Sequence, residues 1–180
     1  DYEGMRLDRV IFAYPGEESE AILADFSLDV PQHGILGIQG PSGRGKSTML
    51  KLLMRYWDPQ RGQVTLSGTP LPQIDVHARR RIQAMMSQET HLFDGMIRDN
   101  LLIALPEAEI RDGGAAGVLD ARLREALAKA SVLDLIDSLP DGLDTQVGEL
   151  GDRLSEGERQ RIGLARVFLR NADLVLFDEP

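Results

Sequence analysis

Gly40-Pro41-Ser42-Gly43-Arg44-Gly45-Lys46-Ser47 is the stretch that decides the fold of this 180-residue chain. It fits the pattern G-x-x-x-x-G-K-[ST]. Glycines let the backbone curl so that successive N–H groups face a phosphate, and the N-terminus of a following helix adds partial positive charge. In such a loop the ammonium group of Lys46 reaches the β and γ phosphates, and the Ser47 hydroxyl ligates Mg²⁺. The stretch therefore predicts a nucleotide-binding loop.

The residues that flank this loop supply the context that the pattern requires. Ile35-Leu36-Gly37-Ile38 is apolar on both faces, which predicts a buried parallel strand leading into the loop. A helix is predicted after the loop, from Lys46 to Tyr56. A Gly-rich surface turn is the alternative interpretation, and the predicted strand and helix favour the phosphate site over it.

A second segment with phosphate-site chemistry lies at the end of the chain. Leu174-Val175-Leu176-Phe177 predicts a buried strand, and Asp178-Glu179 follows it directly. Adjacent carboxylates after a buried strand are costly unless they meet a cation or take part in proton transfer. We therefore expect Asp178 in the Mg²⁺ shell and Glu179 as the base that polarises the attacking water. A surface turn is the alternative, against which the phosphate loop in the same chain argues.

The rest of the pattern divides the chain into a strand-rich first third and a helical middle. Half-buried antiparallel strands are predicted where apolar residues alternate, around 10–12, 26–30 and 64–66, and a further strand is predicted at 82–86. From Met96 onward the spacing turns helical, with leucines four residues apart at 119, 123 and 127. Residues 96–150 are predicted to form a helical lobe, followed by a helix from Ser155 to Arg170.

Composition excludes several classes of protein. The chain has 20 Lys and Arg against 29 Asp and Glu, a formal charge of -9, which argues against nucleic-acid binding. It contains no cysteine, so disulfides and thiolate metal sites are excluded and a reducing cytosolic compartment fits. No run approaches the ~18 apolar residues of a membrane span, so we expect another segment or chain to cross any membrane at which the protein works.

Leu154-Ser155-Glu156-Gly157-Glu158-Arg159-Gln160-Arg161 lies between the two phosphate-site segments. Ser155 and Glu158 have the spacing of a capping box, which places backbone N–H groups at a helix start. The whole stretch resembles the signature motif of the ATP-binding domains of ABC transporters, usually written LSGGQ. The resemblance implies that two such domains dimerise head to tail, and that Ser155 and Gly157 contact the γ-phosphate held by the partner.

The resemblance covers the whole chain and assigns further residues. Tyr14 is similar to the aromatic residue that stacks on adenine, and Gln88 to the glutamine that joins the nucleotide site to the membrane partner. A core aromatic residue and an ordinary surface amide are the alternatives. The implied ATP contacts in the loop are Gly40, Pro41, Ser42, Gly43, Arg44, Gly45, Lys46, Ser47 and Thr48. The implied Mg²⁺ ligands are Ser47, Gln88 and Asp178, and the implied catalytic residues are Lys46, Gln88 and Glu179.

Two stretches resemble those of exporter-type members, Leu92 to Leu101 and Thr145 to Glu149, which in exporters face the intracellular loops of the membrane domains. The implied fold is α/β, a RecA-like P-loop NTPase core with an N-terminal antiparallel β subdomain and an inserted α-helical subdomain. The implied function is ATP-driven dimerisation and hydrolysis that power transport. The implied partners are an identical or different second ATP-binding domain and N-terminally fused transmembrane domains, which hold the chain at the cytoplasmic face of the inner membrane.

The chain departs from the family pattern at two places. Glu156 and Glu158 stand where Gly and Gln are usual, and the sequence ends at Pro180, before the family's switch histidine. The resemblance thus implies that the C-terminal part of the domain is absent, and we expect this chain to hydrolyse ATP slowly or not at all. Two other functions stay open. One is a soluble ABC ATPase acting on DNA or ribosomes. The short spacing from Gln88 to Ser155 argues against its chromosome-maintenance members, which insert long coiled coils there, and the acidic charge adds a little. The other is a regulatory module with impaired hydrolysis, against which Glu179 argues.

Overall fold

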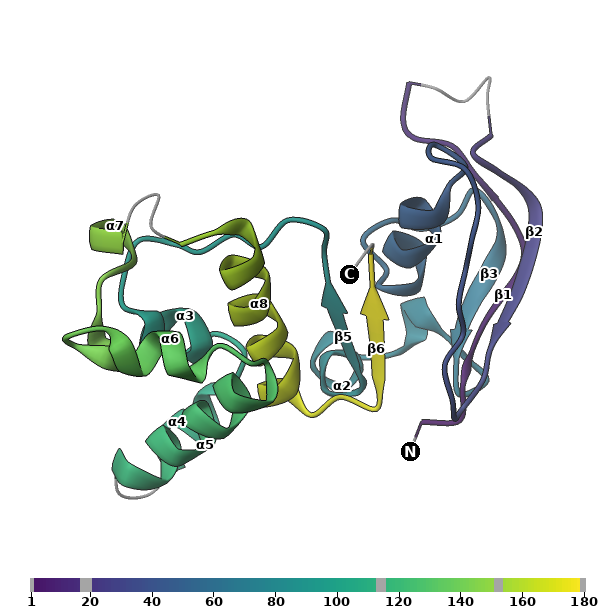
Figure 1. The fold of residues 1–180 in the computed structure, drawn as a ribbon. Coiled ribbons are helices and arrows are strands. Elements are labelled where there is room, and N and C mark those ends of the chain that lie inside the picture. The colour runs from purple at the N-terminus through teal and green to yellow at the C-terminus, as the bar shows by residue number, and fades with distance from the viewer. Residues whose placement is uncertain (1, 17–20, 113–115, 151–153, 179–180) are drawn as a thin grey trace. The chain divides into compact units, whose positions relative to one another are not determined.

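The computed structural model of the chain describes residues 2–16, 21–112, 116–150 and 154–178 (Figure 1). The chain divides into two compact units, Asp1–Gln83 and Ala84–Pro180. The first unit is rich in strands and the second in helices, as the sequence pattern predicts. Each unit has its own buried residues and is described by itself.

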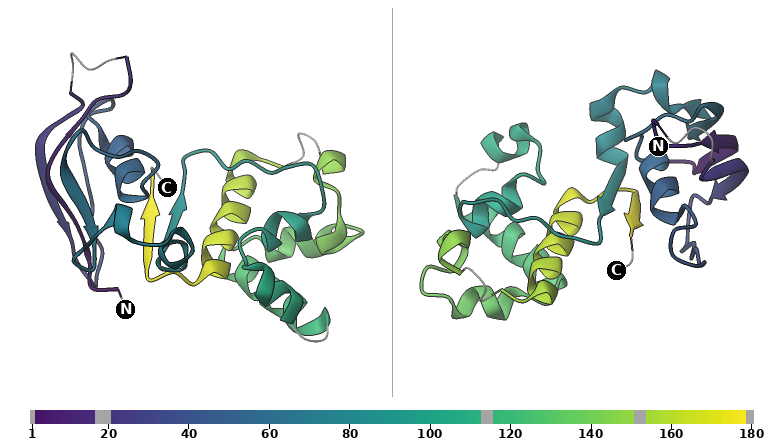
Figure 2. Two further views of the ribbon diagram at one scale, coloured as in Figure 1. Left: turned by 180° about the vertical axis from the view of Figure 1, so that it is seen from behind. Right: turned by 90° about the horizontal axis from the view of Figure 1, so that it is seen from above.

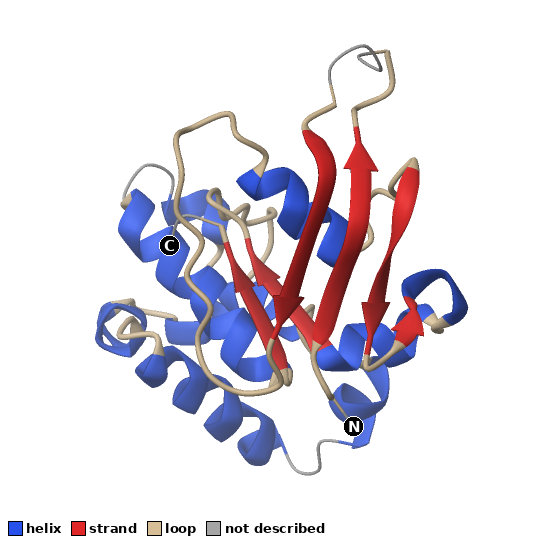
Figure 3. Cartoon of the chain, turned by 90° about the vertical axis from the view of Figure 1, so that its right-hand side faces the viewer, coloured by secondary structure: helices blue, strands red, loops and turns tan. Residues whose placement is uncertain are grey.

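The first unit is built on a four-stranded sheet in the order β2-β1-β3-β4, all of whose pairs are antiparallel (Figure 3). The strands are β1 (Met5–Phe12), β2 (Leu23–Val30), β3 (Arg61–Leu66) and β4 (Thr69–Pro70). Leu7 in the central strand stands opposite Leu28 on one side and Val64 on the other. The antiparallel strands predicted from alternating apolar residues are therefore confirmed.

Helix α1 (Lys46–Leu53) contributes buried Met49, Leu52 and Leu53 to the core of the first unit. The helix begins at the predicted residue but ends before Tyr56. Arg55 adopts a left-handed conformation with φ 53°, which cannot continue a right-handed helix. The unit also contains η1 (Leu71–Gln73) and α2 (Val76–Ile82).

Helix α2 has a defined start because Asp75 caps it. The Asp75 carboxylate accepts hydrogen bonds from the N–H groups of Ala78 (3.1 Å) and His77 (2.9 Å). The bond from Ala78 contributes most to a lowered pKa of this carboxyl group, because it favours the charged form.

The buried strand predicted at Ile35-Leu36-Gly37-Ile38 is wrong. These residues are in no strand, and Ile35 is fully exposed at 101% of its reference area. A run of apolar residues favours burial but cannot supply a neighbouring strand, and extended backbone becomes a sheet strand only when its N–H and C=O groups find ladder partners. In the residues that the structure describes, no strand pairs with residues 35–38.

The second unit combines two paired strands with a set of helices. The strands are β5 (Gln83–Met86) and β6 (Leu174–Phe177), which run in the same direction in Figure 1. The helices are α3 (Ile97–Leu102), α4 (Glu107–Asp112), α5 (Ala116–Lys129), α6 (Leu133–Ser138), η2 (Gly142–Asp144), α7 (Val147–Leu150) and α8 (Glu156–Arg170). Helices α3 to α7 confirm the secondary structure predicted for 96–150; the extent of that lobe as a subdomain stays a prediction.

The core of the second unit lies between α5, α8 and the shorter helices, whose arrangement can be followed in Figure 2. Leu123 and Leu127 on α5 are fully buried, as is Ile162 on α8. Arg98 on α3 connects three elements of this unit. Its guanidinium group forms ion pairs with Asp120 on α5 and, at 2.7 Å, with Asp144 in η2. The hydrogen bond with Asp120 is the main cause of the raised pKa of Arg98.

Among residues 2–16, 21–112, 116–150 and 154–178, no helix has both the length and the apolar character that crossing a bilayer requires.

Shortening a buried leucine of α5 should destabilise the second unit. Leu127 is 0% exposed, so Leu127→Ala removes buried methyl groups and leaves a cavity, at a cost of about 2–5 kcal/mol in the free energy of unfolding. Val118→Ala on the same helix is the control, since Val118 is 65% exposed, and it should change stability by less than about 0.5 kcal/mol. Chemical denaturation measures both; similar losses in the two variants would contradict the packing described for α5.

Candidate functional site

The loop before α1 has the backbone geometry of an anion-binding turn. Gly43 (φ 76°) and Gly45 (φ 84°) both adopt left-handed conformations. Gly45 is the N-cap of α1 and has no side chain that could cap the helix. The start of an α-helix presents N–H groups that have no acceptor within the helix. These residues fit a phosphate group, whose oxygens accept hydrogen bonds from such N–H groups.

Lys46 is held by the loop that precedes it. Its Nζ donates hydrogen bonds to the carbonyl oxygens of Gly40 (2.7 Å) and Pro41 (2.9 Å). The ammonium group therefore lies against the curled loop instead of extending into solvent. This places a point charge at the loop that leads into α1. Recognition of a polyphosphate uses such a charge together with backbone N–H groups.

Tyr14 lies next to the helix that begins in this loop. Its hydroxyl group and the Thr48 hydroxyl share a hydrogen bond of 3.1 Å. The ring is half-buried and meets Phe12 and Trp57 edge-on, with centroid separations of 5.2 and 5.6 Å, while the Lys51 ammonium lies 5.8 Å from its centroid. Two residues assigned to the nucleotide, Tyr14 and Thr48, are thus brought together; stacking on adenine stays a prediction.

The paired strands β5 and β6 bring Gln88 and Asp178 to the same edge of the second unit. The N–H of Asp178 donates to the carbonyl oxygen of Met86 at 3.0 Å, so the chain leaves both strands at this point. Asp178 is half-buried and Gln88 is exposed. Glu179, the predicted base, lies outside the described residues.

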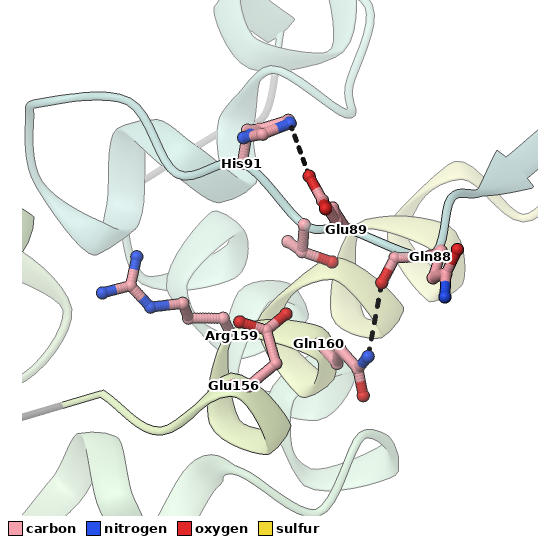
Figure 4. A pocket seen from close by; sticks show the side chains of 7 residues that line it. Gln88, Glu89, His91, Glu156, Arg159 and Gln160 are labelled. Carbon is pink, nitrogen blue, oxygen red and sulfur yellow. Dashed lines mark hydrogen bonds and ion pairs between the residues drawn. The ribbon is translucent and has the colours of Figure 1, made fainter. Parts of the chain in front are cut away.

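The same edge borders a pocket of about 470 Å³ between the segment after β5 and the first turns of α8 (Figure 4). Its lining residues are Gln88, Glu89, Thr90, His91, Glu156, Arg159 and Gln160. Gln160 Nε2 donates to the carbonyl oxygen of Gln88 at 3.3 Å, and the exposed side chains of His91 and Glu89 are 3.9 Å apart. Gln88 is therefore held beside the helix that carries the signature-like stretch.

The start of α8 confirms the predicted capping box. Ser155 is the N-cap, its N–H donates to Glu158 Oε2 at 2.8 Å, and its Oγ accepts from the Glu158 N–H at 3.2 Å. Ser155, Glu156 and Gly157 are exposed, whereas Glu158 is half-buried. One of the two unusual glutamates is thus engaged in the cap, and the other belongs to the pocket lining.

The residues predicted to bind Mg²⁺ come from both units. Ser47 belongs to the first unit and is half-buried, while Gln88 and Asp178 belong to the second. A hydroxyl, an amide oxygen and a carboxylate are oxygen donors of the kind that Mg²⁺ prefers. The donor set fits the ion, and its assembly stays a prediction.

Sequence reasoning missed two polar residues in the core of the second unit, Asn100 and Arg166. Asn100 is 0% exposed, and Arg166 is half-buried, with burial lowering its pKa. Each had a detectable signal, because Asn100 precedes the apolar run 101–103 and Arg166 interrupts the apolar stretch 162–169. A polar residue in such a position indicates a buried partner.

Comparisons with known proteins agree with this geometry. The family model of the ABC transporter matches residues 23–180. The chain is 44% identical over 180 residues to a "probable ABC transporter ATP-binding/permease protein" of Haemophilus influenzae, covering 100% of this chain and 30% of the relative. It is 36% identical over 175 residues to an "ATP-dependent lipid A-core flippase" of Alkalilimnicola ehrlichii, covering 97% and 28%.

A solved structure is also similar. A bacterial Atm1-family ABC exporter with ATP bound matches with a TM-score of 0.85 and 33% identity, covering 99% of this chain and 29% of that chain. The chain thus spans less than a third of the length of these relatives.

Gly45→Ala should impair the phosphate loop more than Gly40→Ala. At Gly45 a Cβ atom would lie 2.9 Å from Ile22 Cγ2, and the left-handed backbone adds strain of about 1–3 kcal/mol. At Gly40 a Cβ atom meets nothing within 4 Å. Titration calorimetry with Mg-ATP should show at least about tenfold weaker binding for Gly45→Ala, the equivalent of about 1.4 kcal/mol. Equal affinities of the two variants would refute the role given to Gly45.

Proposed function

The chain belongs to the ABC transporter family, and from that premise we propose that it binds and hydrolyses Mg-ATP to power the export of a substrate across a membrane. The single observation that carries the proposal is the phosphate loop, in which Lys46 is held against the carbonyl groups of Gly40 and Pro41 and the left-handed Gly45 begins α1. This arrangement suits the triphosphate of a nucleotide, since it combines directed hydrogen-bond donors with a point charge.

ATP hydrolysis requires a metal ion and an activated water in addition to the loop. In the proposed site Ser47, Asp178 and Gln88 would hold Mg²⁺, and Glu179 would polarise the water that attacks the γ-phosphate. Mg²⁺ would neutralise charge that develops on the phosphate oxygens. Gln88 and Asp178 follow the paired strands β5 and β6 at the same edge of the sheet. This proximity supports a shared role of the two residues.

Dimerisation is the step that links ATP to transport in this proposal. Ser155 and Gly157 at the start of α8 would contact the γ-phosphate bound by a second ATP-binding domain. The exposure of both residues and the helix N-terminus beneath them support this role. The names of the relatives join ATP-binding and permease functions, so transmembrane domains are the proposed further partners, with this chain at the cytoplasmic face of the membrane. The rate of hydrolysis by the chain itself stays a prediction.

Lys46→Ala should remove most of the affinity for Mg-ATP. The substitution takes away the charge that meets the β and γ phosphates, and we expect affinity to fall by at least about tenfold. Lys129→Ala is the matched control, because Lys129 pairs with Glu125 at 2.8 Å on the exposed face of α5. Calorimetry measures both variants. Undiminished binding by Lys46→Ala would exclude the proposed nucleotide site.

Glu156→Gly should strengthen ATP-driven dimerisation of the natural full-length protein, with hydrolysis blocked by substitution of Glu179. Glu156 is exposed at the helix end that would face a γ-phosphate, and like charges repel. Glu158→Gln is the comparison, since glutamine can keep the capping bond to the Ser155 N–H. Sedimentation velocity with ATP gives the dimer fraction. Equal or weaker dimerisation of Glu156→Gly would mean that Glu156 points away from the interface.

A further inference from the structure

One face of α8 is fastened to the segment that follows β5. Gln160, Gly163 and Arg166 are spaced by three residues, so they lie along the same side of the helix. Each contacts a different part of residues 88–100: Gln160 the carbonyl of Gln88, Gly163 the side chain of Thr90, and Arg166 the residues His91 and Asn100. The contacts follow the helix for its first three turns.

Arg166 makes the strongest of these contacts. Its Nε donates to the Asn100 carbonyl at 2.7 Å, one terminal nitrogen to the His91 carbonyl at 2.9 Å, and the other to Asn100 Oδ1 at 2.9 Å. No carboxylate among the described residues forms an ion pair with it. Partial burial of a cation beside neutral acceptors has a desolvation cost in free energy. The planar guanidinium group, however, can donate to several acceptors at once in a fixed geometry.

Asn100 connects the contacts of Arg166 to the loop at residues 93–96. Its Nδ2 donates to the carbonyl oxygens of Phe93 and Met96, both at 3.0 Å, and its Oδ1 accepts from the Phe93 N–H at 3.0 Å. With Arg166 as the second donor to Oδ1, every hydrogen-bonding position of the buried amide is used. Asn100 thus closes residues 93–96 into one piece, and Arg166 fastens that piece to α8.

Gly163 lets the segment approach the helix backbone. A Cβ atom at this position would lie 2.5 Å from Thr90 Oγ1 and 2.9 Å from Thr90 Cγ2. Real Cβ atoms do not tolerate such distances, so any larger residue at 163 would force the Thr90 side chain, or the segment that carries it, to shift away from α8.

We propose that Arg166, acting through Asn100 and the His91 carbonyl, is a positioning residue that holds the Gln88 segment and the N-terminus of α8 in one frame. This inference rests on the proposed function, in which Gln88 contacts the Mg²⁺ of the nucleotide bound by this chain and Ser155 contacts the nucleotide bound by the partner domain. If the Gln88 segment and the N-terminus of α8 keep a fixed relative position, nucleotide binding at one site changes the affinity at the other site. Loosening the frame should therefore uncouple the two sites while leaving ATP binding at the phosphate loop intact.

The first test is the steady-state ATPase kinetics of the natural full-length protein. The unchanged protein should show a Hill coefficient for ATP above 1. Arg166→Lys keeps the charge but cannot reach three acceptors, so kcat should fall by about tenfold, KM should change by less than about twofold, and the Hill coefficient should approach 1. Arg122→Lys is the matched control, because Arg122 also donates to a carbonyl of α8, that of Leu169 at 3.1 Å, but not to residues 88–100.

The second test uses a compensating pair. Gly163→Ala should lower kcat and the Hill coefficient as Arg166→Lys does, since the added methyl group displaces Thr90. Thr90→Ala removes the Oγ1 and Cγ2 atoms that clash, so the double variant should recover most of the lost activity. Because Thr90→Ala would also reverse a loss of stability caused by this clash, the folded fraction of each variant is measured by circular dichroism, and kcat is compared per folded molecule. Absence of recovery would count against the frame.

Hydrogen–deuterium exchange separates this inference from the proposed function. Without nucleotide, Arg166→Lys should speed exchange about tenfold at residues 88–100, whereas Arg122→Lys should not. In the unchanged protein, ATP should slow exchange at residues 40–48 and 154–160, and Arg166→Lys should retain the first effect and lose the second. If ATP does not slow exchange at residues 40–48, the proposed function fails. The comparison of Arg166→Lys with Arg122→Lys without nucleotide still tests whether Arg166 holds residues 88–100 in place. Unaltered exchange at 88–100 or an unchanged Hill coefficient in Arg166→Lys would overturn the inference.

Discussion

The second unit depends on how one half-buried guanidinium group is satisfied. Arg166 donates hydrogen bonds of 2.7 to 2.9 Å to three oxygen atoms, which belong to His91 and Asn100. Both residues lie in the segment from the end of β5 to α3. Because a charge that loses water must find acceptors, the segment has little choice of position once α8 has formed. The fully buried Asn100 extends the constraint to the loop at 93–96. The pocket beside Gln88 is a consequence of that placement.

In the first unit, the geometry of one turn sets the start of a helix. Left-handed glycines at 43 and 45 turn the chain into α1, whose N-cap Gly45 has no side chain. Tyr14 supports this end of the helix through its hydrogen bond to Thr48. A helix start presents backbone N–H donors, and glycine-rich turns of this kind direct such donors toward an anion.

Motifs with local physical causes could be predicted from the sequence, and features that need distant partners could not. The glycine turn that leads into α1, the cap at Ser155 and the strand at 174–177 each follow from residues close together in the chain, and the structure contains all three. The run at 35–38 failed because strand formation depends on a neighbour that apolar character does not specify. Arg166 and Asn100 were missed because their partnership spans 66 positions, although each is a polar residue in apolar surroundings.

Lys46 shows how a flexible side chain can be prepared for its ligand. A free lysine loses up to about 2 kcal/mol of rotamer entropy when it is immobilised. In this chain the two carbonyl contacts of its ammonium group already hold it against the loop, so much of that entropy is lost during folding. In the proposed site, a phosphate would meet a charge whose position is already set, and less of the interaction energy would be consumed by ordering the receptor. The free energy of folding, and not that of binding, would then include most of the cost of ordering Lys46.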